Sequence, residues 1–212
     1  MGVVVTTPAT RHDLTTPGLV ALELGLDAGD TSLLARIEPL IAEVSDEIAR
    51  SCGLPFGLAR QTYTETLAGH GDANLILSQR PVISITSISL NGTAVDTDDY
   101  VIVSAIGGQV AALSGGYHGS RWGYTSGHPS YTVVYVAGYT LPGNASETLP
   151  PAIRRVATEL VAAAWHSTGY RERGVVETRL GDLTIKYAAG DTLPAAAVAR
   201  VRRAIGLGRA FV

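Results

Sequence analysis

The chain has 212 residues, a formal net charge of −3 and a single cysteine, Cys52. This length is enough for one domain with a sizeable insert and its own hydrophobic core. The weak negative charge argues against a protein that mainly neutralises phosphates, and one cysteine without neighbouring histidines excludes an internal disulfide and a zinc site at that residue. Residues 1–10 contain no basic segment and no apolar run long enough for a signal peptide or a membrane span, so we expect a non-secreted protein with no membrane partner.

The N-terminal part has the periodicity of helices. Residues 14–24 predict a short helix with a threonine cap and Pro17 in its first turn. Apolar residues then recur every three or four positions, which predicts a helix of about twenty residues capped by Gly53. These apolar positions are Leu33, Ile37, Leu40, Ile41, Val44 and Ile48. Pro39 removes one hydrogen bond of this helix and predicts a kink or a break there.

Four acidic residues crowd the other face of the same predicted helix, namely Glu38, Glu43, Asp46 and Glu47. Acidic residues on a helix commonly form a solvated face, and an acidic contact surface is the alternative. We keep these four residues as candidates for a contact with another subunit.

From residue 60 the apolar pattern changes to a period of two, which is typical of strands. The predicted strands are residues 61–67, 74–77, 82–90, 100–103, 110–113 and 131–136. Turns such as Asn91-Gly92 connect them closely, and short connections favour antiparallel pairing.

Residues 115–129 are rich in glycine and lack an apolar period, which predicts an exposed loop. Tyr117, Trp122 and Tyr124 are its candidate contact residues, because loops often carry binding and aromatic side chains are adaptable contacts. A hairpin tip without a binding role is the alternative.

The C-terminal part returns to helical periodicity. Residues 150 and 151 are prolines that open a helix ending near Gly169, residues 175–179 and 183–187 predict a hairpin, and a last helix begins at Pro194. The last helix and the tail are basic, with Arg200, Arg202, Arg203 and Arg209. Arginine near a helix C-terminus is favoured by the helix dipole, so a local role and an interface role both remain open.

These elements together predict an α+β fold, in which amphipathic helices from the two ends of the chain pack together around a β-rich antiparallel insert. Residues 1–59 are the predicted N-terminal helical part, residues 60–140 the β-rich insert, and residues 141–212 the C-terminal helices, hairpin and tail.

The residue types of catalysis and metal binding do not occur at the required spacing. The five histidines stand apart, Ser120 lacks the Gly-x-Ser-x-Gly pattern of a nucleophile turn, and no glycine-rich phosphate loop opens a helix. Asp96, Asp98 and Asp99 are typical of a solvated turn. The sequence therefore predicts a non-enzymatic protein without a metal or a cofactor.

Several stretches, in order along the chain, are similar to the head-tail connector, or adaptor, proteins of tailed bacteriophages and gene transfer particles. The first runs from Leu33 to Phe56 and includes Ser51-Cys52-Gly53-Leu54-Pro55-Phe56; the second runs from Gln79 to Ile88 and leads to Asn91-Gly92. The third is residues 131–139 followed by Pro150-Pro151-Ala152-Ile153, and the fourth is the closing hairpin with the basic helix. The resemblance covers most of residues 14–209. Pro39 and the long loop at 115–129 depart from the family pattern.

The resemblance implies a virion structural protein, located at the head-tail interface and assembled in the bacterial cytoplasm. It implies a ring, in the family commonly of about twelve copies, which joins the capsid portal protein to the adjacent stopper or tail terminator and lets DNA pass through its lumen unread. Arg209, Phe211 and Val212, in a glycine-containing tail, are then expected to reach the portal.

Two other readings remain open. Another neck component, such as a stopper or tail-completion protein, belongs to the same structural class. A small hydrolase or carbohydrate-binding module would instead use the aromatic loop around Trp122.

Overall fold

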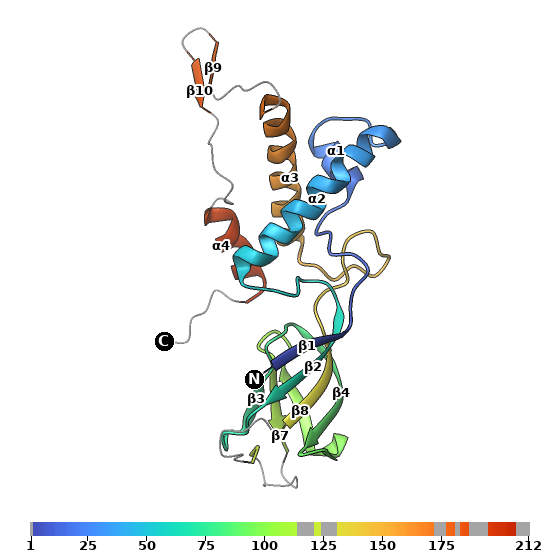
Figure 1. The fold of residues 1–212 in the computed structure, drawn as a ribbon, viewed down its shortest axis with the longest axis vertical. Coiled ribbons are helices and arrows are strands. Elements are labelled where there is room, and N and C mark those ends of the chain that lie inside the picture. Colours follow the sequence, from blue (N-terminus) through green and yellow to red (C-terminus); the bar gives the residue numbers. More distant parts are fainter. Residues whose placement is uncertain are drawn as a thin grey trace. The chain divides into compact units, whose positions relative to one another are not determined.

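The computed structural model describes residues 2–113, 121–123, 131–171, 177–180, 183–186 and 195–206. The chain divides into two compact units, each drawn in Figure 1. The β unit consists of residues 1–11 and 58–140, and the helical unit consists of residues 12–57 and 141–212. The predicted α+β class, with helices from both ends and a β-rich middle, is confirmed. The predicted helical segment 1–59 is wrong at its start, because residues 1–11 belong to the β unit.

The helical unit begins with α1 (Pro17–Glu23) and α2 (Thr31–Cys52). Asp30 caps α2, since its Oδ1 accepts hydrogen bonds from the amides of Ser32 at 2.9 Å and Leu33 at 3.2 Å. Gly53 ends the helix in the left-handed region, at a φ of 74°, as predicted for a C-terminal glycine. The helix continues through Pro39, so the predicted break does not occur.

The second half of the helical unit contains α3 (Pro151–Arg171), the hairpin of β9 (Glu177–Leu180) and β10 (Leu183–Lys186), and α4 (Ala195–Ala204). Strands β9 and β10 pair antiparallel with Leu180 opposite Leu183, which confirms the predicted hairpin. None of the described helices is both long and apolar enough to cross a lipid bilayer.

The core of the helical unit lies where α2 packs against α1, α3 and α4. Its fully buried side chains include Ile37, Ile41 and Ile48 from α2 and Ile153 from α3. Each such side chain contributes about 1.5–3 kcal/mol by leaving water. The three- and four-residue spacing of the α2 positions therefore predicted the buried face correctly.

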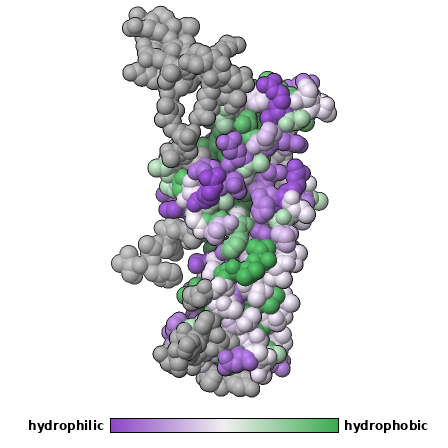
Figure 2. Space-filling view, viewed as in Figure 1, coloured by the Kyte–Doolittle hydropathy of each residue, from purple (hydrophilic) through white to green (hydrophobic). Residues whose placement is uncertain are grey.

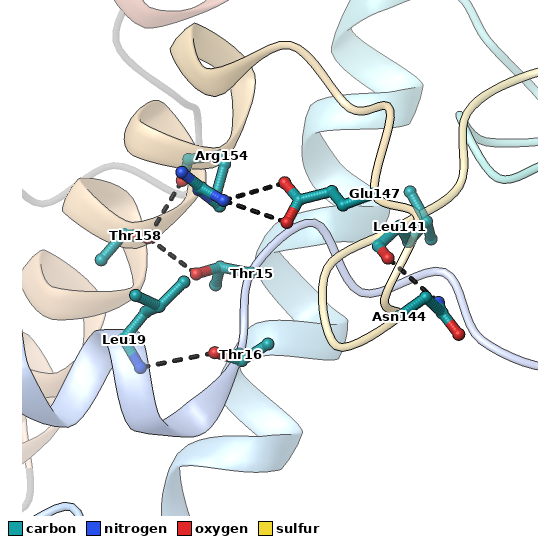
Figure 3. A network of polar contacts seen from close by, with 8 residues as sticks. All are labelled: Thr15, Thr16, Leu19, Leu141, Asn144, Glu147, Arg154 and Thr158. Atoms are coloured by element: carbon teal, nitrogen blue, oxygen red, sulfur yellow. Dashed lines mark hydrogen bonds and ion pairs between the residues drawn. The ribbon is translucent and has the colours of Figure 1, made fainter.

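A polar network ties α3 to the segment before α1 (Figure 3). The hydroxyls of Thr15 and Thr158 lie 2.7 Å apart, and Thr158 also donates to the carbonyl of Arg154. Arg154 pairs with Glu147 through Nη1, with both carboxylate oxygens at 3.0 Å. Because both threonine side chains are buried, these hydrogen bonds offset the cost of removing the hydroxyls from water.

The β unit contains a five-stranded antiparallel sheet in the order β1-β2-β8-β4-β5. Its strands are β1 (Gly2–Thr7), β2 (Gln61–Leu67), β8 (Tyr131–Ala137), β4 (Val82–Leu90) and β5 (Thr93–Ala94). Along β2 and β8 every second residue is buried, as the alternation in the sequence predicts. Strand β1 was not predicted; it pairs with β2 at the edge of the sheet.

A second sheet in the same unit has the order β3-β7-β6, formed by β3 (Asn74–Ile76), β7 (Gln109–Ala112) and β6 (Tyr100–Ser104). A 3₁₀ turn at Thr97–Asp99 precedes β6 and is capped by Asp96, which accepts from the amide of Asp98 at 3.1 Å. The amide of Val82 in β4 donates to the carbonyl of Ala105 at 2.9 Å, and this contact joins the two sheets.

Candidate assembly interface

The basic helix α4 is seated on the helical unit by Val201 and by Ile205, which directly follows the helix; both are almost fully buried. Of its three predicted interface arginines, Arg200 donates from Nη1 to Glu159 Oε2 at 3.0 Å, and Arg202 donates from Nη2 to the carbonyl of Ser51 at 2.9 Å. Both contacts lie within the same unit. The structure therefore supports a role within the subunit for these two arginines.

Arg203 differs from its two neighbours on α4. It is exposed, and no ion pair to it is found among the described residues. Its guanidinium is accordingly available to an external partner. Arg209, Phe211 and Val212 lie outside the described residues.

Glu159 on α3 is the acceptor at the centre of a small charged network. Its Oε1 also accepts from Arg155 Nε at 2.8 Å, so one carboxylate bridges two guanidiniums. The hydrogen bond from Arg155 is the main reason that the pKa of Glu159 lies below its usual value, and the contacts from Arg200 add to it. This network uses charge to fix α4 to α3.

The side chain of Cys52, in the last turn of α2, lies close to Arg202 of α4. Cys52 is 5% exposed, as expected for a small buried residue, and burial raises the pKa of its thiol although Arg202 opposes the shift. The thiol is thus held in its neutral, unreactive form.

The four predicted acidic residues of α2, like the arginines of α4, include some that pair within the described part of the unit and some that do not. Arg50 lies 2.7 Å from Glu47 and 3.9 Å from Asp46, both one turn earlier on the same helix. Glu38 and Glu43 are exposed, and among the described residues no ion pair reaches them. Two of the four candidates therefore present uncompensated charge to the surroundings.

The exposed-loop prediction is wrong for Trp122, which is 4% exposed. Its indole Nε1 donates to the carbonyl of Val110 at 2.9 Å, and its ring meets Tyr131 edge to face, with centroids 5.3 Å apart. A buried indole with a satisfied donor packs the β unit and is not presented to a ligand. Tyr117 and Tyr124 lie outside the described residues.

A polar cluster in the β unit surrounds Glu65 on β2, whose side chain is fully buried. The carboxylate accepts from the Tyr135 hydroxyl at 2.7 Å, from the Ser78 amide at 3.0 Å and from the Ser78 hydroxyl. The Tyr135 hydroxyl also accepts from the amide of Gln79 at 3.2 Å. The cluster therefore ties the segment after β3 to the middle of the large sheet.

Sequence reasoning missed the Glu65 cluster, although the signal was present. Residues 61, 63, 65 and 67 alternate toward the core, so Glu65 had to be buried together with Tyr63 and Leu67. What the sequence did not reveal was that Ser78 and Tyr135 supply its donors. Glu65 and Tyr135 are buried whereas Ser78 is exposed, and the hydrogen bonds of the cluster serve packing.

No metal site is found in the described part of the chain, where no three His, Cys, Asp or Glu side chains gather closely enough to hold an ion. The strongly hydrophilic residues in Figure 2 cover mainly the helical unit, whereas the face of the β unit in this view carries mostly weakly polar and hydrophobic residues. In the part of the chain that the structure describes, the candidates for polar contacts with a partner are therefore the helix surfaces around Arg203 and around Glu38 and Glu43.

No protein-family model matches this sequence, and no curated protein is similar to it. A chain from the neck of an empty gene transfer agent particle, computed with C6 symmetry, is similar in structure with a TM-score of 0.54 and 18% sequence identity. That match covers 96% of this chain and 95% of the other.

A chain from the virion of a native gene transfer agent particle gives a TM-score of 0.50 and 17% identity, over 96% of this chain and 94% of the other. At sequence identities this low, the similarity shows a shared fold and nothing more specific. The resemblance noted in the sequence is thereby confirmed at that level, and the chain shares its fold with a chain from the neck of a gene transfer agent particle.

Proposed function

We propose that this chain is a structural subunit of the neck of a phage-like particle, where it forms an adaptor ring between the capsid portal and the next neck or tail protein. The observation that carries the proposal is the likeness to a neck chain over 96% of this chain. A likeness that spans both units, and nearly all of both chains, supports a shared architecture and not merely a shared motif.

The distribution of charge supports a ring. In a closed ring each copy meets the next through two different surfaces, so the surfaces must be complementary and not identical. The helical unit offers exposed acids at Glu38 and Glu43 on α2 and an exposed base at Arg203 on α4. We assign these residues to opposite sides of the contact between neighbouring copies.

Arg200 and Arg202 then have an indirect role. They hold α4 against Glu159 and the end of α2, and so they position Arg203 and the tail that follows. The tail, with Arg209, Phe211 and Val212, is proposed to reach the portal. The role is structural and requires no catalytic group or cofactor.

The net charge of −3 fits a channel that DNA crosses without being held. A weakly acidic wall repels phosphates, whereas a basic wall would retain them and make passage depend on salt. We expect a ring of about twelve copies. The adjoining neck protein is expected to be a stopper or a tail terminator.

The experiment that tests the proposal is electron cryo-microscopy of the assembled particle. The expected result is a closed ring of this chain between the portal and the tail. A position at the tail tip or on the capsid surface would contradict the proposal.

A charge-reversal series tests the assigned contact. Arg203→Glu alone should reduce ring assembly in the particle, and a combination with Glu38→Arg and Glu43→Arg should restore it, because opposite charges again face each other. Arg50→Glu is the matched control, since Arg50 pairs within its own helix. Equal loss from Arg203→Glu and the triple variant would exclude this pairing.

A further inference from the structure

The outer face of the β3-β7-β6 sheet exposes aliphatic side chains together with two uncharged polar ones, Asn74 and Gln109. The strand register places Val101 opposite Ala111, and Ala111 opposite Asn74, so these three residues share a face. Val103 lies where the register shifts between Ile102 and Ser104, and Ile76, opposite Gln109, follows Asn74 on the same side of β3. Val101 is 44% exposed, Val103 59% and Ile76 54%.

The opposite face of this sheet is the one that packs inward. Leu75, Val110 and Ile102 lie in register across it, and Leu75 and Val110 are buried. The sheet therefore covers the core of the β unit with one face and exposes aliphatic side chains on the other. Single exposed aliphatic residues are normal, but several on one uncharged face are typical of an interaction surface.

The composition of these three strands adds to the argument. None of β3, β6 and β7 contains a charged residue. A sheet face that stays in water usually alternates apolar with polar or charged residues. This face lacks the charge that would keep it hydrated and unpaired.

A second uncharged surface lies in the same unit, at strand β1. This strand ends the five-stranded sheet and has the sequence Gly-Val-Val-Val-Thr-Thr, without charge or proline, and Val4 is 64% exposed. Natural proteins usually protect an edge strand with lysine, proline or another covering element. Within the described residues, β1 has β2 on one side and no strand on the other.

We propose that the β unit carries a subunit contact of its own, in which the outer face of the β3-β7-β6 sheet of one copy packs against β1 of the next copy. This inference rests on the proposed ring. The occupant is a second copy because a head-to-tail contact between identical chains requires two different complementary surfaces on each chain. The β unit supplies both, whereas a foreign partner would account for only one of them.

The two surfaces also match in chemistry. Both expose valines and neither carries charge, so their contact would bury Val4 against Val101 and Val103 without desolvating an ionised group. Burial of aliphatic surface is the favourable term in such a contact.

The size of the contact predicts its strength. Three strands about 4.8 Å apart, each a few residues long, present on the order of a few hundred Å². A stable pair of proteins buries about 800 Å² on each partner. The contact is therefore weak alone and acts together with the contact between helical units, so free chains associate only at high concentration.

Disulfide trapping tests the inference on the full chain. In a Cys52→Ala background, Val4→Cys and Val103→Cys are introduced singly and together, and the proteins are oxidised at high concentration. We expect a ladder of covalent oligomers from the double variant. An equal mixture of the two single variants should give covalent dimers and no larger species.

Three results would overturn the inference. They are no intermolecular cross-link in either experiment, an internal disulfide as the main product of the double variant, and Val103–Val103 dimers as the main product of the single variant. The last would indicate a symmetric contact between two copies of the same face.

A second measurement separates the contact from the fold. Val101→Asp with Val103→Asp places charge on the exposed face, and an unchanged circular dichroism spectrum verifies folding. Combined with the Val4→Cys and Gln109→Cys pair, these changes should reduce cross-linking at least tenfold, whereas Leu22→Asp on α1 should not. Equal cross-linking in both proteins would refute the role of the face.

The outcome is distinguishable from that of the proposed function. A neck ring in which the β units do not touch would refute this contact and leave the adaptor role intact. Head-to-tail cross-linking of a chain found elsewhere in the particle would do the reverse.

Discussion

The two units of this chain manage charge differently. In the helical unit, charged residues lie on exposed helix faces and several are paired, as Glu159 is with Arg155 and Arg200. Across the described strands of the β unit, Glu65 is the one charged residue, and it is buried. The helical unit therefore offers contacts that salt and charge reversal can modulate, whereas the β unit offers contacts that depend on apolar burial.

The two tryptophans give the largest test of this comparison, because one lies in each unit. Trp122→Ala is expected to reduce the free energy of unfolding by about 3–5 kcal/mol, since it removes a buried ring from the β unit. Trp165→Ala should have a smaller effect, because Trp165 is half-buried and packs under Arg36. Urea denaturation followed by circular dichroism measures both. A smaller loss of unfolding free energy for Trp122→Ala than for Trp165→Ala would contradict the burial of Trp122 and favour an exposed position.

Two acids, one from each unit, give the next test. Glu65→Ala leaves the Tyr135 hydroxyl and two donors of Ser78 without their acceptor inside the β unit, and we expect a loss of about 3 kcal/mol. Glu38→Ala on the exposed face of α2 should change the free energy of unfolding by no more than about 0.5 kcal/mol. Equal effects of the two substitutions, measured by the same denaturation, would remove the distinction between the units.

The dependence of stability on alkaline pH gives a third test, because it reports on Tyr63, a neutral side chain buried in the β unit. Burial raises the pKa of Tyr63 from 10.0 to about 12, against a small opposing effect of its hydrogen bond from Gln61. The folded-state pKa lies above the unfolded value, so the stabilising contribution is present below pH 10 and is lost as the pH rises to about 12.

The size of this loss is about 2 kcal/mol. Tyr63→Phe should make stability less dependent on pH in that window, as measured by denaturation at a series of pH values. An unchanged pH dependence in the variant would show that Tyr63 ionises normally.

The smallest expected effect concerns the ion pairs that hold α4. A double-mutant cycle on Glu159→Gln and Arg200→Gln should give a coupling energy of about 0.5 kcal/mol that decreases with added salt, because the pair is partly exposed. The lowered pKa of Glu159 means that this contribution is present above its ordinary pKa of 4.5 and is lost as the pH falls through the lower folded value. A coupling that persists in high salt would argue for a buried pair.

The sequence predicted most elements correctly where a local pattern decides the structure. Residues 82–90 were predicted as a strand and β4 has these bounds, and Gly53 caps the C-terminal end of α2 as predicted. Pro39 was expected to bend or break α2, but the helix is continuous because the apolar positions on both sides of it pack on one face. A local penalty of about 3 kcal/mol is smaller than the burial of several isoleucines.

The failures have a common physical cause, which is a partner distant in sequence. Strand β1 was missed because a run of six residues shows little periodicity, and its pairing partner β2 begins more than fifty residues later. Trp122 was predicted to be exposed because its glycine-rich surroundings carry no pattern. Its burial depends on Val110 and Tyr131, which belong to β7 and β8.

The candidate interface could be predicted only as a set of charged residues. Which of them are used internally depends on tertiary contacts, such as Arg200 with Glu159 and Arg202 with the carbonyl of Ser51. Their separation in sequence leaves no local signal. The structure thereby reduces the described candidates to Arg203, Glu38 and Glu43.

The β unit interrupts the sequence of the helical unit, and this order has a consequence for synthesis on the ribosome. The hydroxyl pair of Thr15 and Thr158 joins residues 143 positions apart, and α2 cannot cover its isoleucine face until α3 has been made. At roughly 5–20 residues per second, translation of residues 58–140 occupies on the order of 10 seconds. During that interval the apolar face of α2 lies open in the nascent chain, and it is the part of this protein that we expect a chaperone to meet first.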